Sequence, residues 1–340
     1  MQTFRKTFIG LALASLVSFG ASAADKTLDI VKQRGHLKCG VSQGLPGFSN
    51  PDNKGNWTGI DVDLCKALAA AIFGDAKKAK FVPLSAKERF TAIQSGEVDI
   101  IARNTTWSMH RDTALGIDFR SVNYYDGQGF MVRQDLGVTS ALELDGASLC
   151  TNQGTTTELN AADYFRANKM EYEIVAFEKA DEAVAVYNSG RCDAYTTDSS
   201  ALYAQRLKLT DPKAHIVLPE IISKEPLAPA VRQGDDQWGD IVDWTHYATV
   251  AAEELGLTSK NVGQMKASQN PAIRRLLGLD GTFGVNLGIR PDWALQAIKQ
   301  VGNYGEIFER NVGVNTPLGI KRGINALWTD GGLQYAPPIR

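Results

Sequence analysis

Two stretches of the chain repeat the same order of apolar and polar positions. Residues 81–100 and residues 175–194 each read as an apolar strand and then a helix with apolar positions three and four apart. Both continue with Ser-Gly, a charged residue, an apolar residue and Asp, and Gly96 and Gly190 fall where a helix C-terminus favours a left-handed residue. Strand–helix–strand units of this length join parallel strands by a right-handed crossover. The repeat therefore predicts two α/β lobes of similar plan.

Each predicted lobe opens with a further strand and helix. The opening strand expected at residues 37–42 leads through a loop rich in Gly, Pro and Asn to a helix from about residue 61 to 73, which ends at Gly74. Residues 147–151 lead in the same way to a helix from about 156 to 168. Ligand crevices in sheets of this kind lie beyond the carboxyl ends of the strands. Functional side chains are therefore expected just after Ser42, Ala102, Thr151 and Thr196.

A shared phrase suggests where the chain crosses between the lobes. Val-Arg-Gln occurs in residues 129–135 and again in residues 227–235, and we interpret these segments as two crossing strands that form a hinge. The expected bounds are residues 24–133 plus 232–340 for lobe 1 and residues 134–231 for lobe 2. Beyond the second crossing, helices are expected over residues 238–255 and 291–312, followed by a Gly-rich tail that covers lobe 1.

The N-terminus predicts export. Arg5 and Lys6 precede an apolar run over residues 8–19, and Ala21-Ser22-Ala23 is a small-residue cleavage site, so residues 1–23 are predicted to be a signal peptide cleaved after Ala23. The run is too short to span a bilayer, and the mature chain is expected to be an exported, soluble product that starts near Ala24. Removing the two cations changes the formal net charge from -2 to about −4, which argues against a nucleic-acid partner.

The four cysteines fit disulfide bonds in an oxidising compartment better than metal ligation. Four cysteines allow three pairings, and free thiols remain the alternative. The predicted layout favours a pair between a strand and the helix packed over it, and a second pair between two neighbouring strands. These pairs are Cys39–Cys65 and Cys150–Cys192. No metal or cofactor site is expected.

One predicted strand end carries groups suited to an anion. Residues 98–111 run from a short apolar strand through Asn104, Thr106 and Ser108 to Arg111. Hydroxyls and the free N–H groups of a following helix bind anions, and a guanidinium pairs both oxygens of a carboxylate. A strand followed by a capped helix uses the same residue types, so this loop alone leaves a purely structural role open.

The second lobe carries a matching half-site. Gly154 lets the backbone approach closely, and Thr155 and Thr156 open a helix whose N-terminus favours negative charge, although the same residues also suit a helix cap with Glu158. Asp198 follows another strand of this lobe, where it either caps a helix or turns its carboxylate into the cleft. A cation and an anion that face each other across a cleft match the zwitterion of an α-amino acid.

These segments resemble the periplasmic amino-acid-binding proteins of ABC uptake systems. The resemblance covers essentially the whole mature chain, including the Gly-x-Asp-Val-Asp-Leu helix start at residues 59–64, Ser-Gly-x-x-Asp, the Thr…Arg loop, Gln-Gly-Thr-Thr and Gly-Arg-x-Asp-Ala. The length, the Asn-Thr-Thr-Trp-Ser loop and the long tail look most like the general L-amino acid-binding proteins. The resemblance implies the α/β type II periplasmic binding fold, with two doubly wound lobes joined by a two-strand hinge.

The resemblance also implies roles and partners. Arg111 would hold the α-carboxylate, aided by Thr106 and Thr156, while Asp198 and the region of Asn104 would hold the α-ammonium group. The chain would be a monomer that binds L-amino acids and delivers them to the inner-membrane permease subunits of an ABC transporter.

The expected side-chain pocket departs from many relatives. They place an aromatic residue at the position of Leu45, and the aliphatic side chain here fits a wider pocket of broad specificity. Ser85 and Arg89 fall where relatives that bind acidic amino acids recognise the side-chain carboxylate, although Arg89 fits a solvated helix position equally well. Trp107 is expected to pack at the core or rim.

An enzyme of the same fold, such as a cyclohexadienyl-type dehydratase, is the main alternative. Such chemistry needs a poised acid or base in the cleft. The histidines show no triad or metal-ligand spacing, and His110, beside Arg111, is the one plausible candidate. A sensory domain would need a transmembrane segment and an output module. The paired cation and anion favour binding without catalysis.

Overall fold

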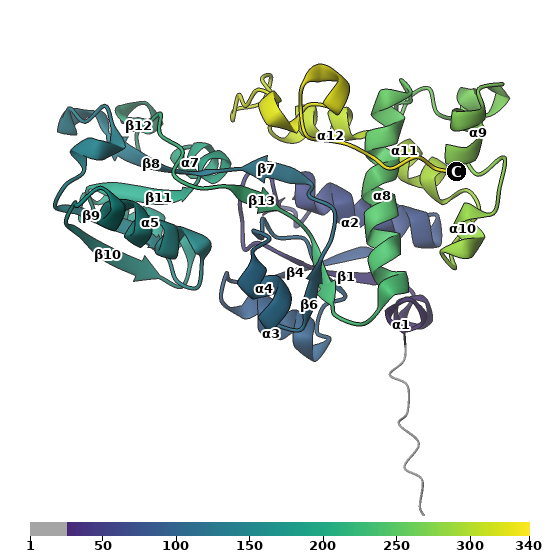
Figure 1. The fold of residues 1–340 in the computed structure, drawn as a ribbon, viewed down its shortest axis with the longest axis horizontal. Helices are drawn as coiled ribbons and strands as arrows, with labels where there is room; N and C mark the ends of the chain where they lie inside the picture. The colour runs from purple at the N-terminus through teal and green to yellow at the C-terminus, as the bar shows by residue number, and fades with distance from the viewer. Residues whose placement is uncertain (1–25) are drawn as a thin grey trace, which may run out of the picture.

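The computed structural model describes residues 26–340, so the predicted signal peptide and its cleavage site lie outside the described residues. Figure 1 shows two lobes side by side, each built on one five-stranded sheet, with the C-terminal helices gathered on the first lobe. No helix within residues 26–340 is both long and apolar enough to cross a membrane.

The first sheet has the strand order β4-β1-β5-β14-β6. Strand β1 is central and runs parallel to β4 and β5, whereas β14 runs antiparallel to β5 and β6. The strands are β1 Leu37–Val41, β4 Ala79–Pro83, β5 Ile100–Ile101, β6 Ile117–Phe119 and β14 Ala230–Arg232.

The second sheet repeats this plan in the order β10-β9-β11-β8-β12. Strand β9 runs parallel to β10 and β11, and β8 runs antiparallel to β11 and β12. The strands are β8 Gln128–Arg133, β9 Ala147–Asn152, β10 Tyr172–Phe177, β11 Ala194–Asp198 and β12 His215–Val217. Two lobes of similar α/β plan are therefore confirmed.

The predicted crossing strands are wrong. Residues 129–135 largely lie within β8 of the second sheet, and residues 227–235 include β14 of the first sheet. The lobes are instead joined by β7 (Tyr124–Asp126) and β13 (Glu225–Leu227), which pair antiparallel with each other. Val-Arg-Gln is shared because β8 and β14 occupy the same fourth position in their two sheets. Equivalent sheet positions, and not the hinge, account for the repeated phrase.

Helices cover both sheets. In the second lobe these are α5 Thr156–Ala167, α6 Ala180–Asn188 and α7 Ser199–Arg206. In the first lobe they are α1 Thr27–Arg34, α2 Ile60–Phe73, α3 Glu88–Ser95, α4 Met109–Ala114, α8 Asp236–Glu254, α9 Pro271–Leu276, α10 Phe283–Asn286, α11 Trp293–Val301 and α12 Tyr304–Asn311. A short hairpin of β2 (Asn50–Pro51) and β3 (Trp57–Thr58) precedes α2.

The single helix expected over residues 291–312 is in fact two helices. Gly302 has φ 101° between α11 and α12, a conformation that favours glycine. Asn303 then caps α12, because its side chain accepts the N–H of Glu306 while the Glu306 carboxylate accepts the N–H of Asn303. Both helices pack against α2 and α8, and the break also lets Phe308 of α12 stack on Tyr124 of β7.

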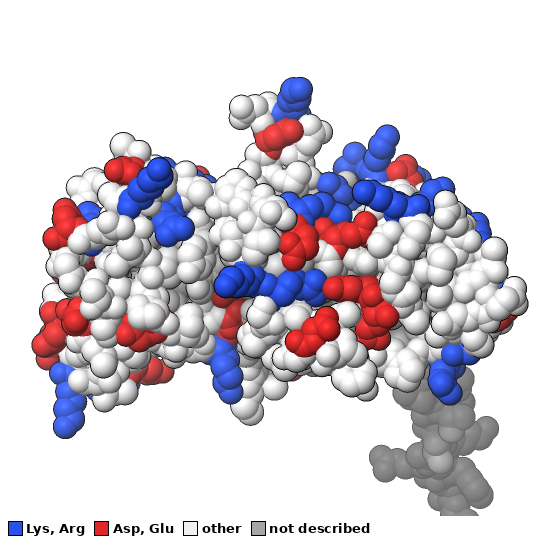
Figure 2. Space-filling view, turned by 90° about the horizontal axis from the view of Figure 1, so that it is seen from above, with Lys and Arg blue, Asp and Glu red and all other residues white. Residues whose placement is uncertain are grey.

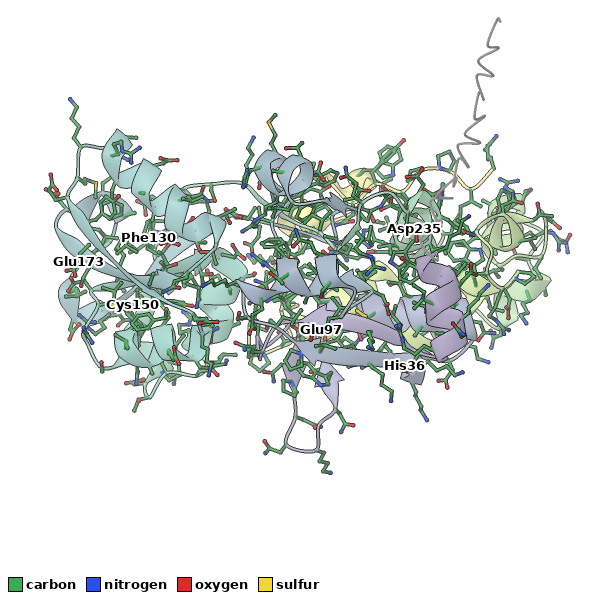
Figure 3. All side chains as sticks on the ribbon, turned by 90° about the horizontal axis from the view of Figure 1, so that it is seen from below. His36, Glu97, Phe130, Cys150, Glu173 and Asp235 are labelled. Atoms are coloured by element: carbon green, nitrogen blue, oxygen red, sulfur yellow. A yellow bond between two sulfur atoms is a disulfide. The ribbon has the colours of Figure 1, made fainter. Side chains whose placement is uncertain are left out.

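Both expected cysteine pairs form disulfides. Cys39 of β1 joins Cys65 of α2, and Cys150 of β9 joins Cys192, which lies two residues before the start of β11. Figure 3 shows Cys150 and Phe130 on the sheet of the second lobe, among side chains that fill its core. The second bridge thus ties together two neighbouring strands whose ends carry cleft residues.

Replacing both Cys150 and Cys192 with alanine should lower the free energy of unfolding by about 2–4 kcal/mol, because the bridge restricts the unfolded chain. Urea unfolding of oxidised protein measures this difference. Peptide mapping without reductant should recover the Cys150–Cys192 link, and a free thiol at either position in exported protein would contradict the assignment.

Candidate ligand-binding site

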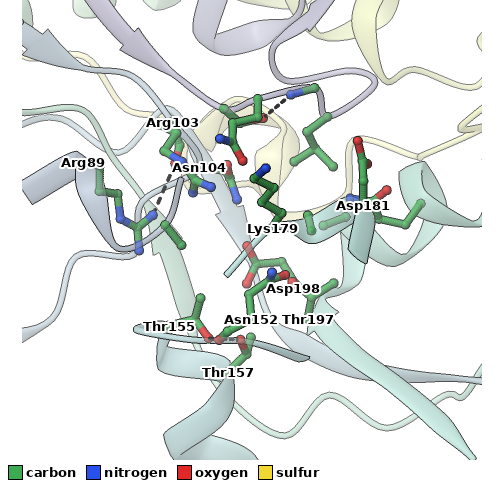
Figure 4. A pocket seen from close by; sticks show the side chains of 18 of the residues that line it. Arg89, Arg103, Asn104, Asn152, Thr155, Thr157, Lys179, Asp181, Thr197 and Asp198 are labelled. Carbon is green, nitrogen blue, oxygen red and sulfur yellow. Dashed lines mark hydrogen bonds between the residues drawn. The ribbon is translucent and has the colours of Figure 1, made fainter. Parts of the chain in front are cut away.

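The two lobes enclose a cavity of about 280 Å³. Lobe 1 lines it with the loops after β1 and β5 and with Ala86 and Arg89, and lobe 2 with the loops after β9 and β10, the end of β11, and α7. Figure 4 shows Arg89 and Arg103 on one side of this space and Thr155 and Thr157 on the other, with Asp198 between them. The lining thus follows the strand ends at which functional residues were expected.

Direct contacts hold the lobes close together. Lys208 Nζ of lobe 2 donates to the carbonyl oxygen of Gly44 in lobe 1 at 2.7 Å. The hydroxyl oxygens of Thr106 and Thr156 lie 3.3 Å apart across the cleft. The cavity therefore belongs to a closed arrangement of the lobes.

Most of the residues singled out from the sequence line this cavity, but one does not. Leu45, Arg89, Asn104, Thr106, Thr155, Thr156 and Asp198 all contribute to the lining. The guanidinium of Arg111 lies behind it, where Nη1 donates to Thr106 O at 3.0 Å and Nη2 to Gly154 O at 3.5 Å. Arg111 is 6% exposed, and its contacts reach both lobes. Trp107 stacks on Phe119 at the rim, as expected.

Three arginines of lobe 1, the buried Arg89 and Arg111 and the half-buried Arg103, form a cationic wall. Arg89 is 2% exposed, so its interpretation as a solvated residue is wrong. Its Nη1 donates to Thr105 Oγ1 at 3.1 Å, while its Nε is buried with no hydrogen-bond partner. Burial, followed by the charge of neighbouring Arg111, lowers the pKa of Arg89 well below its usual value, and burial lowers the pKa of Arg103 to about 10. Arg103 was missed in the sequence, since only the fold turns it toward the cavity.

These guanidinium groups lack carboxylate partners. Within residues 26–340, none of Arg89, Arg103 and Arg111 lies within ion-pair distance of an Asp or Glu side chain. Buried charges are costly unless they are paired. The wall is therefore suited to an anion that enters from outside.

Asp198 is the opposing charge. It ends β11 and precedes α7, but its side chain makes no capping hydrogen bond, so a helix-capping role is wrong. Burial, and then the nearby carboxylates of Asp126 and Glu225, raise the pKa of Asp198 well above its ordinary value, against the effect of Asn104 and Arg89. Within residues 26–340, no Lys, Arg or His lies within ion-pair distance of Asp198, so this buried carboxylate is suited to an entering cation.

Asn104 links these two charged sides. It adopts φ 33°, which is unusual for a residue other than glycine, and its Oδ1 is buried with no hydrogen-bond partner. Its backbone N–H donates to Asp61 Oδ2 at 2.8 Å, which holds the loop in this shape. Burial raises the pKa of Asp61 to about 6. The strained loop thus leaves one buried polar oxygen without a hydrogen-bond partner, on a residue that lines the cavity.

The threonines of α5 combine structural and cleft roles. Thr155 caps α5, since its Oγ1 accepts the N–H of Glu158 at 3.3 Å, so the capping interpretation holds for this residue. Thr156 Oγ1 instead donates to the carboxylate of Glu225 at 2.9 Å, and Thr106 Oγ1 donates to the same carboxylate oxygen. Glu225 was not singled out from the sequence, because a glutamate before proline in a connecting segment carries no local signal.

The geometry places cations on one side of a closed cleft and a buried anion on the other. A ligand that carries both charges a short distance apart would compensate both sides. Within residues 26–340, no cluster of three His, Cys, Asp or Glu side chains is arranged to hold a metal ion.

The sequence pattern of the bacterial extracellular solute-binding proteins, family 3, matches residues 37–263. The chain therefore belongs to this family, and it is the substrate-binding protein of an ABC transporter for amino acids.

The named relatives match nearly the whole chain. The general L-amino acid-binding periplasmic protein AapJ of Rhizobium johnstonii is 61% identical over 96% of this chain and 97% of its own length. The glutamate/glutamine/aspartate/asparagine-binding protein BztA of Rhodobacter capsulatus is 55% identical over 99% of each chain. A solved periplasmic binding protein of Brucella ovis with glutathione bound is 60% identical and superposes with a TM-score of 0.91, covering 93% of this chain and 100% of that one. The type II periplasmic binding fold is thereby confirmed.

The raised pKa of Asp198 makes a prediction for ligand-free protein. A carboxyl group whose pKa is raised by folding contributes stability below its unfolded pKa of about 4 and loses it as the pH rises through the folded value. Asp198→Asn should therefore stabilise ligand-free protein at pH 8 by about 1–3 kcal/mol, the usual cost of an uncompensated buried polar group.

Urea unfolding of ligand-stripped wild type and Asp198→Asn at pH 8 and pH 4 measures this effect. The difference should shrink toward zero at the lower pH. Lower stability of the variant at pH 8 would show that the carboxylate already has a compensating partner.

Proposed function

We propose that this chain captures L-amino acids of broad specificity between its closing lobes in the periplasm and delivers them to inner-membrane permease subunits. The observation that carries this proposal is that opposite charges line one cleft and, within residues 26–340, form no ion pair there. The guanidinium groups of Arg111, Arg89 and Arg103 can bind an anion, and the carboxylate of Asp198 can bind a cation. An α-amino acid supplies both groups on a single carbon atom.

We assign the α-carboxylate to Arg111 and the N-terminus of α5. A guanidinium can pair both carboxylate oxygens, and the free N–H groups of a helix N-terminus favour an anion. Nη2 of Arg111 already lies 3.5 Å from Gly154 O, next to that terminus. We assign the α-ammonium group to Asp198, beside the free Oδ1 of Asn104.

The rest of the cavity supports broad specificity. Leu45, which is buried in the cleft wall, provides no aromatic ring to clamp a ligand. Arg89 and Arg103 line the side-chain space, so a carboxylate there would find a cation. The names of AapJ and BztA point to several amino acids, and the Brucella ovis protein holds glutathione, whose γ-linked glutamate keeps a free α-amino acid group.

The relatives also support the expected location and partners. AapJ is named as a periplasmic protein and the Brucella ovis protein as an ABC transporter periplasmic binding protein, which supports a periplasmic location and permease subunits as partners. Removal of the signal peptide after Ala23 and a monomer as the working form are part of this proposal. Figure 2 shows acidic and basic side chains side by side on one face of the molecule, a mixed surface of the kind that soluble carriers present.

Catalysis is not favoured. The relatives of high identity are solute-binding proteins, and no histidine lines the cavity within residues 26–340. His110, the one candidate base, is exposed on α4. A dehydratase would need a positioned acid or base at the ligand, and the groups that face this cavity instead match a zwitterion.

Arg111→Ala should weaken the binding of L-glutamate by about a hundredfold or more, because charge-assisted hydrogen bonds in a closed cleft carry roughly 1.5–3 kcal/mol each. Arg111→Lys should not restore binding, since an ammonium group cannot form the planar two-point contact. Isothermal titration calorimetry on ligand-stripped protein measures both. A loss below about threefold for Arg111→Ala would remove this residue from the site.

A competition panel tests specificity. Acidic, neutral polar and aliphatic L-amino acids should all displace a labelled L-glutamate tracer, with affinities within about two orders of magnitude, because the contacts to the common zwitterion dominate. D-enantiomers should bind much more weakly, since inversion moves the ammonium group away from Asp198. Displacement by one amino acid alone would contradict broad specificity and leave the transport role intact.

A further inference from the structure

Glu225 accepts hydrogen bonds from four side chains at the junction of the two lobes. It is 1% exposed and lies on the crossing strand β13. Its Oε2 accepts hydrogen bonds from Thr106 Oγ1 and Thr156 Oγ1, and its Oε1 accepts from Asn160 Nδ2 at 2.6 Å and Ser223 Oγ at 2.7 Å. All four donors are side chains, so one carboxylate organises four neighbours.

The donors come from both lobes. Thr106 follows β5 in lobe 1, whereas Thr156 and Asn160 belong to α5 in lobe 2. Glu225 also lies directly opposite Asp126 in the β7–β13 pair, and like charges at opposed positions normally destabilise a sheet. Within residues 26–340, no Lys or Arg lies within ion-pair distance of Glu225. A charged group is thus kept at the junction of the lobes despite an electrostatic cost.

The chemistry of a hydroxyl group connects Glu225 to the ligand. A threonine hydroxyl has one proton to donate and two lone pairs that accept, and a carboxylate can only accept. Because Thr106 and Thr156 both give their protons to Glu225, each hydroxyl oxygen is left as an acceptor. Both threonines line the cavity. Their oxygens can therefore receive a hydrogen bond from an ammonium group but cannot donate one to a carboxylate.

We propose that Glu225 is a positioning residue that orients the Thr106 and Thr156 hydroxyls as acceptors for the ligand's ammonium group. This inference rests on the proposed function, and it replaces the expected role of these threonines at the α-carboxylate. Glu225 does not touch the ligand itself, since it does not line the cavity. It selects ligands that carry a free ammonium group over plain carboxylates.

The proposal explains why a carboxylate is present and not an amide. Glutamine would offer one oxygen and one NH₂ group, which is a donor. Whichever way the amide turned, the NH₂ group would face either the threonine hydroxyls or the Asn160 amide donor. When the NH₂ group faces the threonines, it cannot accept their hydroxyl protons. These protons then turn toward the cavity, and the ammonium group of the ligand loses its acceptors.

The test compares L-glutamate with glutarate, which lacks only the ammonium group. Glu225→Gln should weaken L-glutamate by about tenfold to a hundredfold, as expected when hydrogen bonds to a charged group are lost. The affinity for glutarate, measured at millimolar concentration by ligand-observed NMR, should change by less than about threefold, because glutarate has no ammonium group whose hydrogen bonds could be lost. Thermal unfolding of ligand-free protein confirms that each variant is folded.

Ser223→Ala is the matched control. It removes a donor to the other oxygen of Glu225, at 2.7 Å, and leaves the two threonines in place. Its ratio of L-glutamate to glutarate affinity should remain that of the wild type. If Glu225 only held the lobes together, each variant would lower the affinities for L-glutamate and for glutarate by the same factor. Ser223→Ala and Glu225→Gln would then differ only in the size of that loss.

A second variant covers the case in which Glu225→Gln fails to fold. Thr106→Val with Thr156→Val removes the oxygens that Glu225 orients, and it should reproduce the selective loss of L-glutamate. An equal loss of both ligands, or no loss of either, in the folded variants would overturn the role of Glu225. Failure of the wild type to bind L-glutamate or any other L-amino acid would instead reject the proposed function, so the two failures are distinguishable.

Discussion

Buried charge without an internal partner is the constraint on which this cleft depends. Arg89 and Arg111 are buried in lobe 1 beside the half-buried Arg103, and Asp198 is buried in the other lobe. Such groups cost stability, because the opposite charges near them lie beyond ion-pair distance and repay only part of the desolvation. A ligand that supplies both charges would remove that cost only when the lobes are closed around it. Ligand recognition and lobe closure would then occur together. A ligand that binds the closed form more tightly than the open form would shift the population toward the closed form.

The fold explains how these charges reach one place. Both sheets have the same strand order, and their three parallel strands end at the cleft. The loop after β5 and the end of β11 therefore bring Asn104 of lobe 1 and Asp198 of lobe 2 close together, and the crossing strands bring Glu225 to the junction of the lobes. Because β7 and β13 are the paired connection, a carboxylate on β13 can contact donors from either lobe.

Much of this could be predicted from the sequence, and the failures have physical causes. The repeat of residues 81–100 in residues 175–194 records local strand–helix patterns, so the two lobes and the strand ends were found. The hinge was misplaced because a repeated phrase marks equivalent strands as well as crossing ones. Arg103 and Glu225 were missed because their roles come from contacts between segments far apart in the chain. Burial of Arg89 likewise depends on tertiary packing and not on its helix.

The central claim is that closure requires both charges of the ligand together. Small-angle X-ray scattering on ligand-stripped protein tests it most directly, with an L-amino acid, its des-amino acid and its decarboxylated amine each added at saturation. The account predicts that the radius of gyration falls with the L-amino acid and stays near the ligand-free value with either single-charged analogue. Equal contraction with the des-amino acid or with the amine would contradict it, because one charge alone would then suffice to close the cleft.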